Sequence, residues 1–149
     1  MIDPRTVPSF TLNDGSPIPC VGMGTFGSDR VTPEEVAGAV AGGLRVGYRL
    51  FDCAACYGNE DVIGPVFSEA LSDGLARDEL FVISKVWNDK HKPADVIASC
   101  KKSLSDLRLD YFDGYLVHWP FPNYHAPGVS GDSRSPDARP YFHEEFMEA

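Results

Sequence analysis

Apolar runs of strand length alternate with segments of helical periodicity through much of this chain. The strand-like runs fall at residues 21–27, 48–52, 79–87 and 111–120. The intervening segments carry apolar residues three or four positions apart, and they begin near Thr32, Asn59 and Pro93. Because parallel neighbouring strands need a crossover, this alternation predicts an α/β fold with a parallel sheet.

The chain before the first of these strands predicts a β-hairpin. Residues 9–12 precede Asn13-Asp14-Gly15, a strong signal for a tight turn, and residues 16–19 return. Residues 1–20 are therefore interpreted as a hairpin. Residues 121–140 are rich in Pro, Gly, Ser and Asp without any period, which predicts a long loop. Residues 141–149 resemble the start of another helix.

Composition narrows the classes of partner. The 149 residues carry a formal net charge of −9, which argues against a nucleic-acid or anionic membrane surface. No apolar run approaches the ~20 residues of a membrane-spanning helix. The first residues lack the basic-then-apolar pattern of a secretory signal. A cytoplasmic protein that binds neither nucleic acid nor membranes is the expectation.

The four cysteines are too few for a disulfide scaffold in a chain of this size. Cys53 and Cys56 form a C-x-x-C pattern, which is typical of a redox pair or half of a zinc site. A zinc site needs about four ligands, and the sequence offers no second pair at suitable spacing. We expect no metal and free thiols beside a pocket, with a redox pair as the alternative.

Polar residues stand where three of the predicted strands end. Asp52, Lys85 and His118 occupy these positions, and Tyr57 follows Asp52 after one short loop. In an α/β barrel the carboxyl ends of the strands share one rim, where chemistry is carried out. Asp52 could instead only cap the following helix.

These residue types together favour proton transfer. A phenol is a weak acid unaided, but an ammonium group from Lys85 would stabilise the phenolate of Tyr57. Asp52 would hold Lys85 in place, and His118 could orient a substrate oxygen. The set predicts a general acid for a carbonyl oxygen. The sequence shows no nucleophile beside an activating base, which argues against a hydrolase.

Several stretches of the chain resemble the aldo-keto reductase family. They are LNDG (12–15), GMGT (22–25), GYRLFDCA (47–54), YGNE (57–60) with Gly64, ISKVW (83–87) and LDYFDGYLVHWP (109–120). The resemblance implies a (β/α)8 TIM barrel of aldo-keto reductase type, of which residues 1–149 would supply about the first four βα units in one domain. It also implies NADPH-dependent reduction of a small aldehyde or ketone to an alcohol.

The resemblance further implies a role for each matching residue. Tyr57 would be the proton donor, supported by Lys85, Asp52 and His118. Gly24, Thr25 and Asp52 would lie at the nicotinamide end of NADPH. The substrate pocket would be lined by Phe26, Trp87, His118 and Trp119, although such aromatic residues also serve ordinary barrel packing. Phe26 stands where many members carry tryptophan, so the sequence does not indicate which carbonyl compound is bound.

The length of the sequence leaves two interpretations open. A complete barrel takes ~250 residues, so the C-terminal half, including the segments that hold the adenosine phosphate in this family, is expected to be absent here. The residues would then be part of a longer, monomeric reductase. Alternatively, they form an inactive half barrel that acts as a binding or assembly partner and associates through its open sheet edges.

Overall fold

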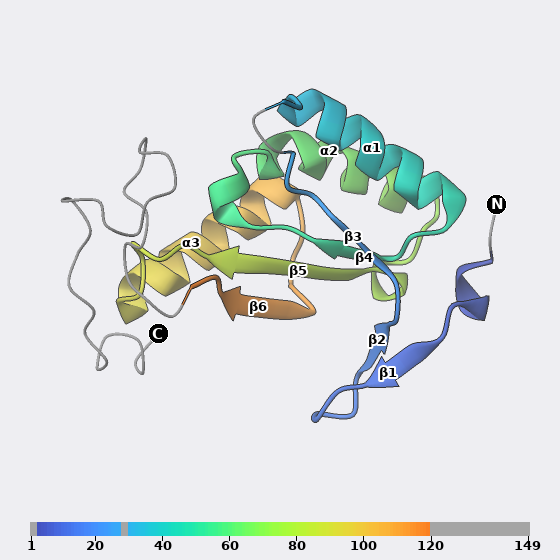
Figure 1. Cartoon of the computed structure of the whole chain (residues 1–149), viewed down its shortest axis with the longest axis horizontal. Coiled ribbons are helices and arrows are strands. Elements are labelled where there is room, and N and C mark those ends of the chain that lie inside the picture. The colour runs from blue at the N-terminus through green and yellow to red at the C-terminus, as the bar shows by residue number, and fades with distance from the viewer. Residues whose placement is uncertain (1–2, 28–29, 120–149) are drawn as a thin grey trace.

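The computed structural model describes residues 3–27 and 30–119. Figure 1 shows the elements, which are β1 (Ser9–Thr11), β2 (Pro17–Pro19), β3 (Gly22–Gly24), α1 (Pro33–Val46), β4 (Leu50–Asp52), α2 (Glu60–Ser72), β5 (Phe81–Val86), α3 (Pro93–Leu107) and β6 (Gly114–Val117). Short 3-10 turns occupy Pro4–Thr6, Ala55–Tyr57 and Arg77–Glu79. The loop predicted at 121–140 and the helix start predicted at 141–149 lie outside the described residues.

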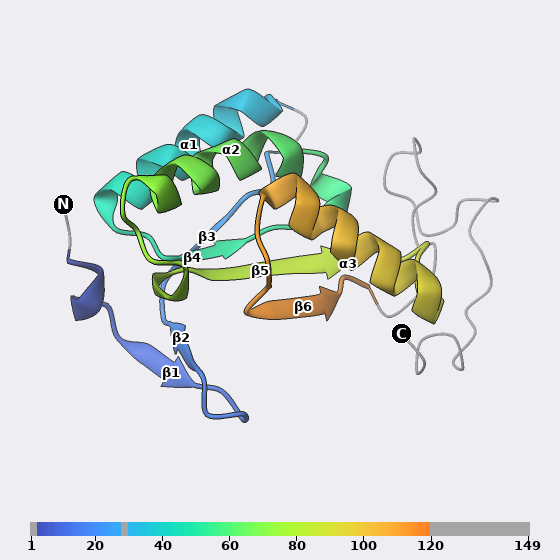
Figure 2. The same ribbon diagram turned by 180° about the vertical axis from the view of Figure 1, so that it is seen from behind.

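The central sheet has four parallel strands in the order β3-β4-β5-β6, so each strand pairs with the next one in the chain. The helices α1, α2 and α3 lie along one face of this sheet, and no described helix covers the other (Figures 1 and 2). The predicted hairpin is confirmed, because β1 and β2 pair antiparallel with Phe10 opposite Ile18. The parallel strands β3 to β6 are separated in the chain by α1, α2 and α3, so the predicted alternation of strands and helices is confirmed.

The core lies between the sheet and the helices. Its fully buried members include Val40, Phe51, Ile63, Phe67, Val82 and Leu107. Full burial of such a side chain stabilises the fold by about 1.5–3 kcal/mol. The apolar spacing that follows Thr32 predicts that Val36, Val40 and Leu44 are buried, and this is confirmed. The apolar spacing that follows Pro93 predicts that Ile97 is buried, which is wrong, because Ile97 is 55% exposed. Each residue turns a helix by about 100°, so Ile97 points past the buried face.

Helix α1 begins and ends as its sequence predicts. Thr32 Oγ1 accepts a hydrogen bond from the Glu35 N–H (3.2 Å), and the Glu35 carboxylate accepts one from the Thr32 N–H (2.8 Å). At the other end Gly47 has a φ of 112°, which favours glycine. The next N–H, that of Tyr48, donates to the Gly43 carbonyl (2.9 Å). Strand β4 therefore starts at Leu50. The predicted start of this strand at residue 48 is wrong.

Strands β5 and β6 are also shorter than predicted. The 3-10 turn Arg77–Glu79 precedes β5, and the Leu80 N–H donates back to the Arg77 carbonyl (3.1 Å). The guanidinium of Arg77 binds the Tyr111 carbonyl (2.7 Å) and the Asp113 carboxylate (2.9 Å), so the residues before β6 contact a side chain. At its other end β5 stops at Val86, so Lys85 lies one residue before the end of the strand.

Gly64 sets the distance between α2 and α3. A Cβ atom at this position would overlap the Asp106 carbonyl oxygen and lie 2.9 Å from the Leu107 carbonyl carbon. Both obstacles are backbone atoms, which cannot rotate away as a side chain can. The two helices can pack this closely only because residue 64 has no side chain. Within the described ranges, no helix is both long and apolar enough to cross a membrane.

We predict that Gly64→Ala destabilises the protein and that Gly38→Ala, its matched control, does not. Alanine favours a helix interior over glycine by about 0.5–1 kcal/mol, and a Cβ on Gly38 in α1 would meet nothing within 4 Å. Overpacking at Gly64 should outweigh that gain and lower the free energy of unfolding by about 1–3 kcal/mol. Urea unfolding followed by circular dichroism measures both variants. Equal stabilities for the two variants would contradict the close helix contact.

Candidate active site

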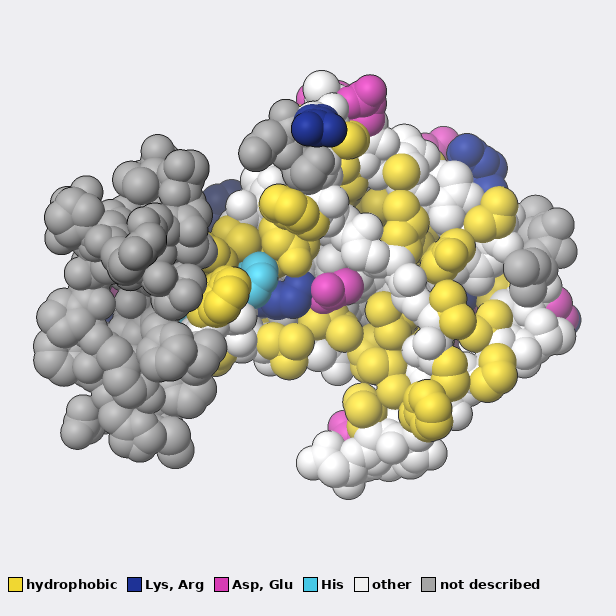
Figure 3. Space-filling model, in the orientation of Figure 1, with side chains coloured by type: hydrophobic (Ala, Val, Ile, Leu, Met, Phe, Trp, Pro, Cys, Tyr) yellow, Lys and Arg dark blue, Asp and Glu magenta, His cyan; other side chains and the backbone are white. Residues whose placement is uncertain are grey.

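Four side chains predicted from the sequence meet at the carboxyl edge of the parallel sheet. Asp52 is the last residue of β4, Tyr57 lies in the 3-10 turn after it, Lys85 is in β5, and His118 directly follows β6. The strand register places Asp52 beside Ile83, and Lys85 beside Leu116. Figure 3 shows acidic, basic and histidine side chains adjoining one another among hydrophobic ones on the face without helices.

Lys85 is at the centre of this group. Its Nζ lies 2.6 Å from Asp52 Oδ1, 2.8 Å from the Cys53 carbonyl oxygen and 3.4 Å from Tyr57 Oη. The lysine side chain is only 10% exposed, whereas that of Asp52 is 41% exposed. A lysine that is nearly buried requires such partners. The carboxylate and the carbonyl thus hold the amine in contact with the phenol.

His118 stands over Tyr57 and Trp87. Its ring meets both of these rings edge to face. The distance between ring centroids is 5.7 Å to Tyr57 and 5.2 Å to Trp87. The backbone N–H of His118 donates to the Val86 carbonyl (3.1 Å). Desolvation, and then the charge of Lys85, lower the pKa of His118, against an opposing effect of Asp52. A lowered pKa keeps this imidazole neutral at pH 7.

The ends of β3 and β4 are joined through Thr25. Its hydroxyl and its N–H both donate to the Asp52 carbonyl at 3.1 Å, and the side chain is almost fully buried. Asn59 Nδ2 donates to the Thr25 carbonyl (2.8 Å). The neighbouring Gly24 has no atom within 4 Å of the place where a Cβ would lie. The backbone at Gly24 therefore faces open space at this edge.

Two structural residues of the site were missed in the sequence. Asn59 was expected only to start a helix, yet its buried amide connects α2 to the end of β3. Glu60 accepts a hydrogen bond from the buried Ser84 hydroxyl (2.6 Å), and burial raises the pKa of Glu60. Both residues belong to the YGNE stretch (57–60). Their place in this stretch, directly after Tyr57, is the sequence signal that could have indicated a structural role for them.

The aromatic residues predicted to line a substrate pocket lie around the same group. Phe26 is 66% exposed and packs against the Tyr57 ring at 5.2 Å. Trp87 contacts the His118 ring. Trp119 follows His118 in the chain and is 38% exposed. The fold thus brings Phe26, Trp87 and His118 together around Tyr57. Trp119 is the residue after His118 in the chain.

The C-x-x-C pair has properties unlike those of a redox pair. Cys53 is fully buried, and desolvation raises the pKa of its thiol to about 12. Desolvation likewise raises the pKa of the Cys56 thiol to about 11. Catalytic C-x-x-C pairs instead have a thiol whose pKa is lowered. Among the residues that the structure describes, no three His, Cys, Asp or Glu side chains are grouped as metal ligands.

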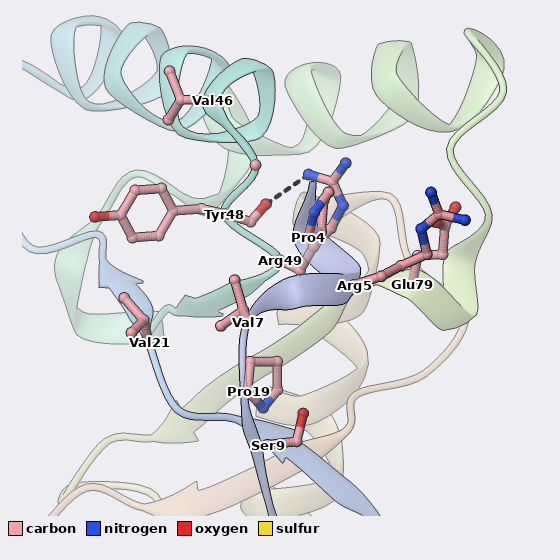
Figure 4. A pocket seen from close by; sticks show the side chains of 11 residues that line it. Pro4, Arg5, Val7, Ser9, Pro19, Val21, Val46, Tyr48, Arg49 and Glu79 are labelled. Atoms are coloured by element: carbon pink, nitrogen blue, oxygen red, sulfur yellow. Dashed lines mark hydrogen bonds between the residues drawn. The ribbon is translucent and has the colours of Figure 1, made fainter. Parts of the chain in front are cut away.

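A separate pocket of ≈ 330 Å³ lies at the opposite end of the sheet, before the start of β4. Figure 4 shows its lining, in which Arg49 donates to the Tyr48 carbonyl (2.8 Å). Arg49 also binds the Leu44 carbonyl (3.1 Å), and Arg5 is paired with Asp3 (2.9 Å). None of Asp52, Tyr57, Lys85 and His118 lines this pocket, so the chemistry is not assigned to it.

A parallel sheet, helices on one of its faces and charged residues paired at its carboxyl edge are typical of part of an α/β barrel. The sequence model of the Aldo/keto reductase family matches residues 20–149. The chain belongs to the aldo/keto reductase family.

The relatives show how much of the family's length this chain matches. It is 50% identical over 114 residues to aldo-keto reductase family 1 member A1-A of Danio rerio, covering 75% of this chain and 34% of that protein. Member A1 of Homo sapiens is 49% identical over 112 residues, covering 74% of this chain and 34% of that protein. The chain spans about a third of the length of these curated relatives.

Solved structures resemble the fold directly. The crystal structure of Bombyx mori aldo-keto reductase (AKR2E4) in complex with NADP has a TM-score of 0.79 at 35% identity, covering 99% of this chain and 46% of that one. The aldo-keto reductase AKR2E5, complexed with NADPH, has a TM-score of 0.71 at 38% identity, covering 78% and 37%. These neighbours are TIM barrels, and the sheet described here matches the N-terminal half of such a barrel.

We predict that Lys85→Met raises the pKa of His118. The lysine charge is one of the two causes that lower this pKa, and its removal leaves Asp52, whose charge acts in the opposite direction. An NMR titration of the His118 ring protons measures the change. Lys102→Met is the control, because Lys102 pairs with Asp106 on the exposed side of α3. An unchanged or lower pKa in Lys85→Met would show that the ammonium does not act on this imidazole.

Proposed function

We propose that the protein reduces aldehydes or ketones to alcohols with NADPH and that Tyr57 donates the proton to the carbonyl oxygen. The observation that carries this proposal is the position of Lys85 Nζ, held between Asp52 at 2.6 Å and Tyr57 Oη at 3.4 Å. Membership of the aldo/keto reductase family supports it, as do the NADP and NADPH complexes of the two solved relatives.

The edge near Gly24 suits the nicotinamide end of the cofactor. The open space beside Gly24 would be filled by any side chain there, and a planar ring can approach such a backbone closely. Thr25 and Asp52 border the same edge and are tied together by hydrogen bonds. When bound, NADPH supplies the hydride for the carbonyl carbon. Gly24, Thr25 and Asp52 are therefore our proposed cofactor contacts.

The proton is handled by Tyr57 and Lys85. Donation from Tyr57 Oη to the carbonyl oxygen leaves a phenolate, and the adjacent Lys85 ammonium offsets that negative charge. Asp52 and the Cys53 carbonyl hold the ammonium in contact with the phenol, so it need not reorganise during the transfer. Positioned general acids of this kind contribute about 10²–10⁴-fold to a rate.

His118 is the proposed second contact to the substrate oxygen. A neutral imidazole has one N–H, which can donate a hydrogen bond to a carbonyl. The centroids of the His118 and Tyr57 rings lie 5.7 Å apart, which supports a substrate oxygen shared by the two groups. Phe26 and Trp87 provide apolar surface for the rest of the substrate. Trp119 is proposed as a further residue that lines the substrate pocket. That the protein is cytoplasmic and monomeric stays a prediction.

The test uses the longest natural polypeptide that contains this sequence. Its NADPH affinity is measured by fluorescence titration, and its activity by loss of NADPH absorbance with an aromatic aldehyde. Binding together with stoichiometric alcohol formation would support the proposal. Absence of binding would overturn it. Binding without turnover of any aldehyde or ketone would contradict the reductase activity and favour a binding role for the chain.

We predict that Tyr57→Phe lowers kcat by about 10²–10⁴-fold while NADPH affinity changes little, because only the proton donor is removed. Tyr48→Phe is the matched control. It removes a phenol hydroxyl from a residue that precedes the start of β4, at the opposite end of the strand from Asp52, and should leave kcat unchanged. Lys85→Met should lower kcat as well, since the phenolate then lacks its cation. Turnover at the normal rate in Tyr57→Phe would rule out its assigned role.

A further inference from the structure

We propose that Cys56 is a positioning residue for His118, whose Nδ1 accepts a hydrogen bond from the Cys56 thiol and whose proton is thereby held on Nε2. This inference rests on the proposed function, because there His118 donates to the substrate oxygen. The observation behind it is the distance of 3.4 Å between Cys56 Sγ and His118 Nδ1. The two residues are 62 positions apart and come from different βα units.

The thiol supplies a constraint that the aromatic neighbours of His118 do not. Tyr57 and Trp87 meet the imidazole edge to face, which restrains the plane of the ring. Such contacts depend on ring shape and quadrupole and distinguish the two nitrogens only weakly. A hydrogen bond to Nδ1 distinguishes them directly, since a neutral imidazole has one donor and one acceptor nitrogen.

The protonation of both partners supports this direction of the hydrogen bond. Desolvation raises the pKa of the Cys56 thiol to about 11, so the sulfur carries its proton at neutral pH although part of the residue is exposed. The pKa of His118 is lowered, first by desolvation and next by Lys85. An S–H group therefore faces a neutral ring, and our proposal assigns the thiol as the donor and Nδ1 as the acceptor.

This arrangement determines what His118 can offer to a substrate. If Nδ1 accepts from the thiol, the single ring proton must be on Nε2. Nε2–H is then a permanent donor, and the substrate oxygen need not select one tautomer from a mixture. A partner that fixes the tautomer of a functional histidine is a known way of tuning such a residue. Cys56 would thus improve substrate positioning without touching the reacting atoms.

The tautomer is measured directly by ¹⁵N NMR of the imidazole nitrogens in histidine-labelled protein. The sequence has four histidines, and loss of one signal set in His118→Gln assigns His118. We expect the wild-type ring to be the Nε2–H tautomer, and Cys56→Ala to show a mixture. A net hydrogen bond of this kind shifts the tautomer ratio by about two- to tenfold. Cys56→Ser keeps a donor and should restore the wild-type spectrum.

The same variants are assayed for carbonyl reduction in the presence of saturating NADPH. Cys56→Ala should lower kcat/KM for the carbonyl substrate by about two- to tenfold, Cys56→Ser should recover it, and NADPH affinity should not change. Cys20→Ala, at an exposed position away from the site, is the control and should resemble wild type in both measurements.

Two results would overturn the proposal. One is an Nδ1–H tautomer in the wild-type protein, which requires no variant to fold. The other is an unchanged His118 spectrum in Cys56→Ala. Because the spectrum is recorded without turnover, it tests the Cys56 contact even if the reductase assay fails. Absence of carbonyl reduction in the wild-type protein would instead contradict the proposed function while leaving the thiol contact standing.

Discussion

The ion pair between Lys85 and Asp52 is the interaction on which the site depends. A lysine with 10% of its side chain exposed has lost most of its hydration, so its amine must be matched by protein groups. The carboxylate comes from the end of β4 and the amine from β5, so satisfying the charge also fixes how these strand ends meet. Tyr57 is then placed by the short turn that follows Asp52.

Much of this arrangement is predictable because it depends on local signals. The box around Thr32 and the glycine at 47 set both ends of α1, and the carboxyl ends of parallel strands necessarily share one edge. Asp52, Lys85 and His118 could therefore be assigned to one site without coordinates. The strand lengths could not, because backbone donors near β4 and β5 are taken by the preceding turns. Tyr48 illustrates this competition.

The contacts that escaped prediction join segments far apart in the chain. Asn59 reaches back to Thr25, Ser84 binds Glu60, and Cys56 meets His118 across 62 positions. Each involves a polar side chain whose partner depends on packing angles that no periodicity encodes. The sequence predicts Cys56 to be a free thiol beside a pocket, or half of a redox pair with Cys53, and indicates no partner for it on another strand. The structure separates the two, because Cys53 is fully buried and Cys56 faces the imidazole.

The carboxyl edge of the sheet holds two kinds of hydrogen-bond donor, the charged Lys85 ammonium and the neutral His118 imidazole. The ammonium of Lys85 lies against a phenol and offsets charge that develops there, while the same positive charge helps to keep His118 neutral. A protonated imidazole beside that ammonium would repel it, so one group remains a cation and the other a neutral donor. A neutral ring, unlike a cationic one, has a choice of tautomer. In our proposal the Cys56 thiol, whose sulfur lies 3.4 Å from Nδ1, settles this choice.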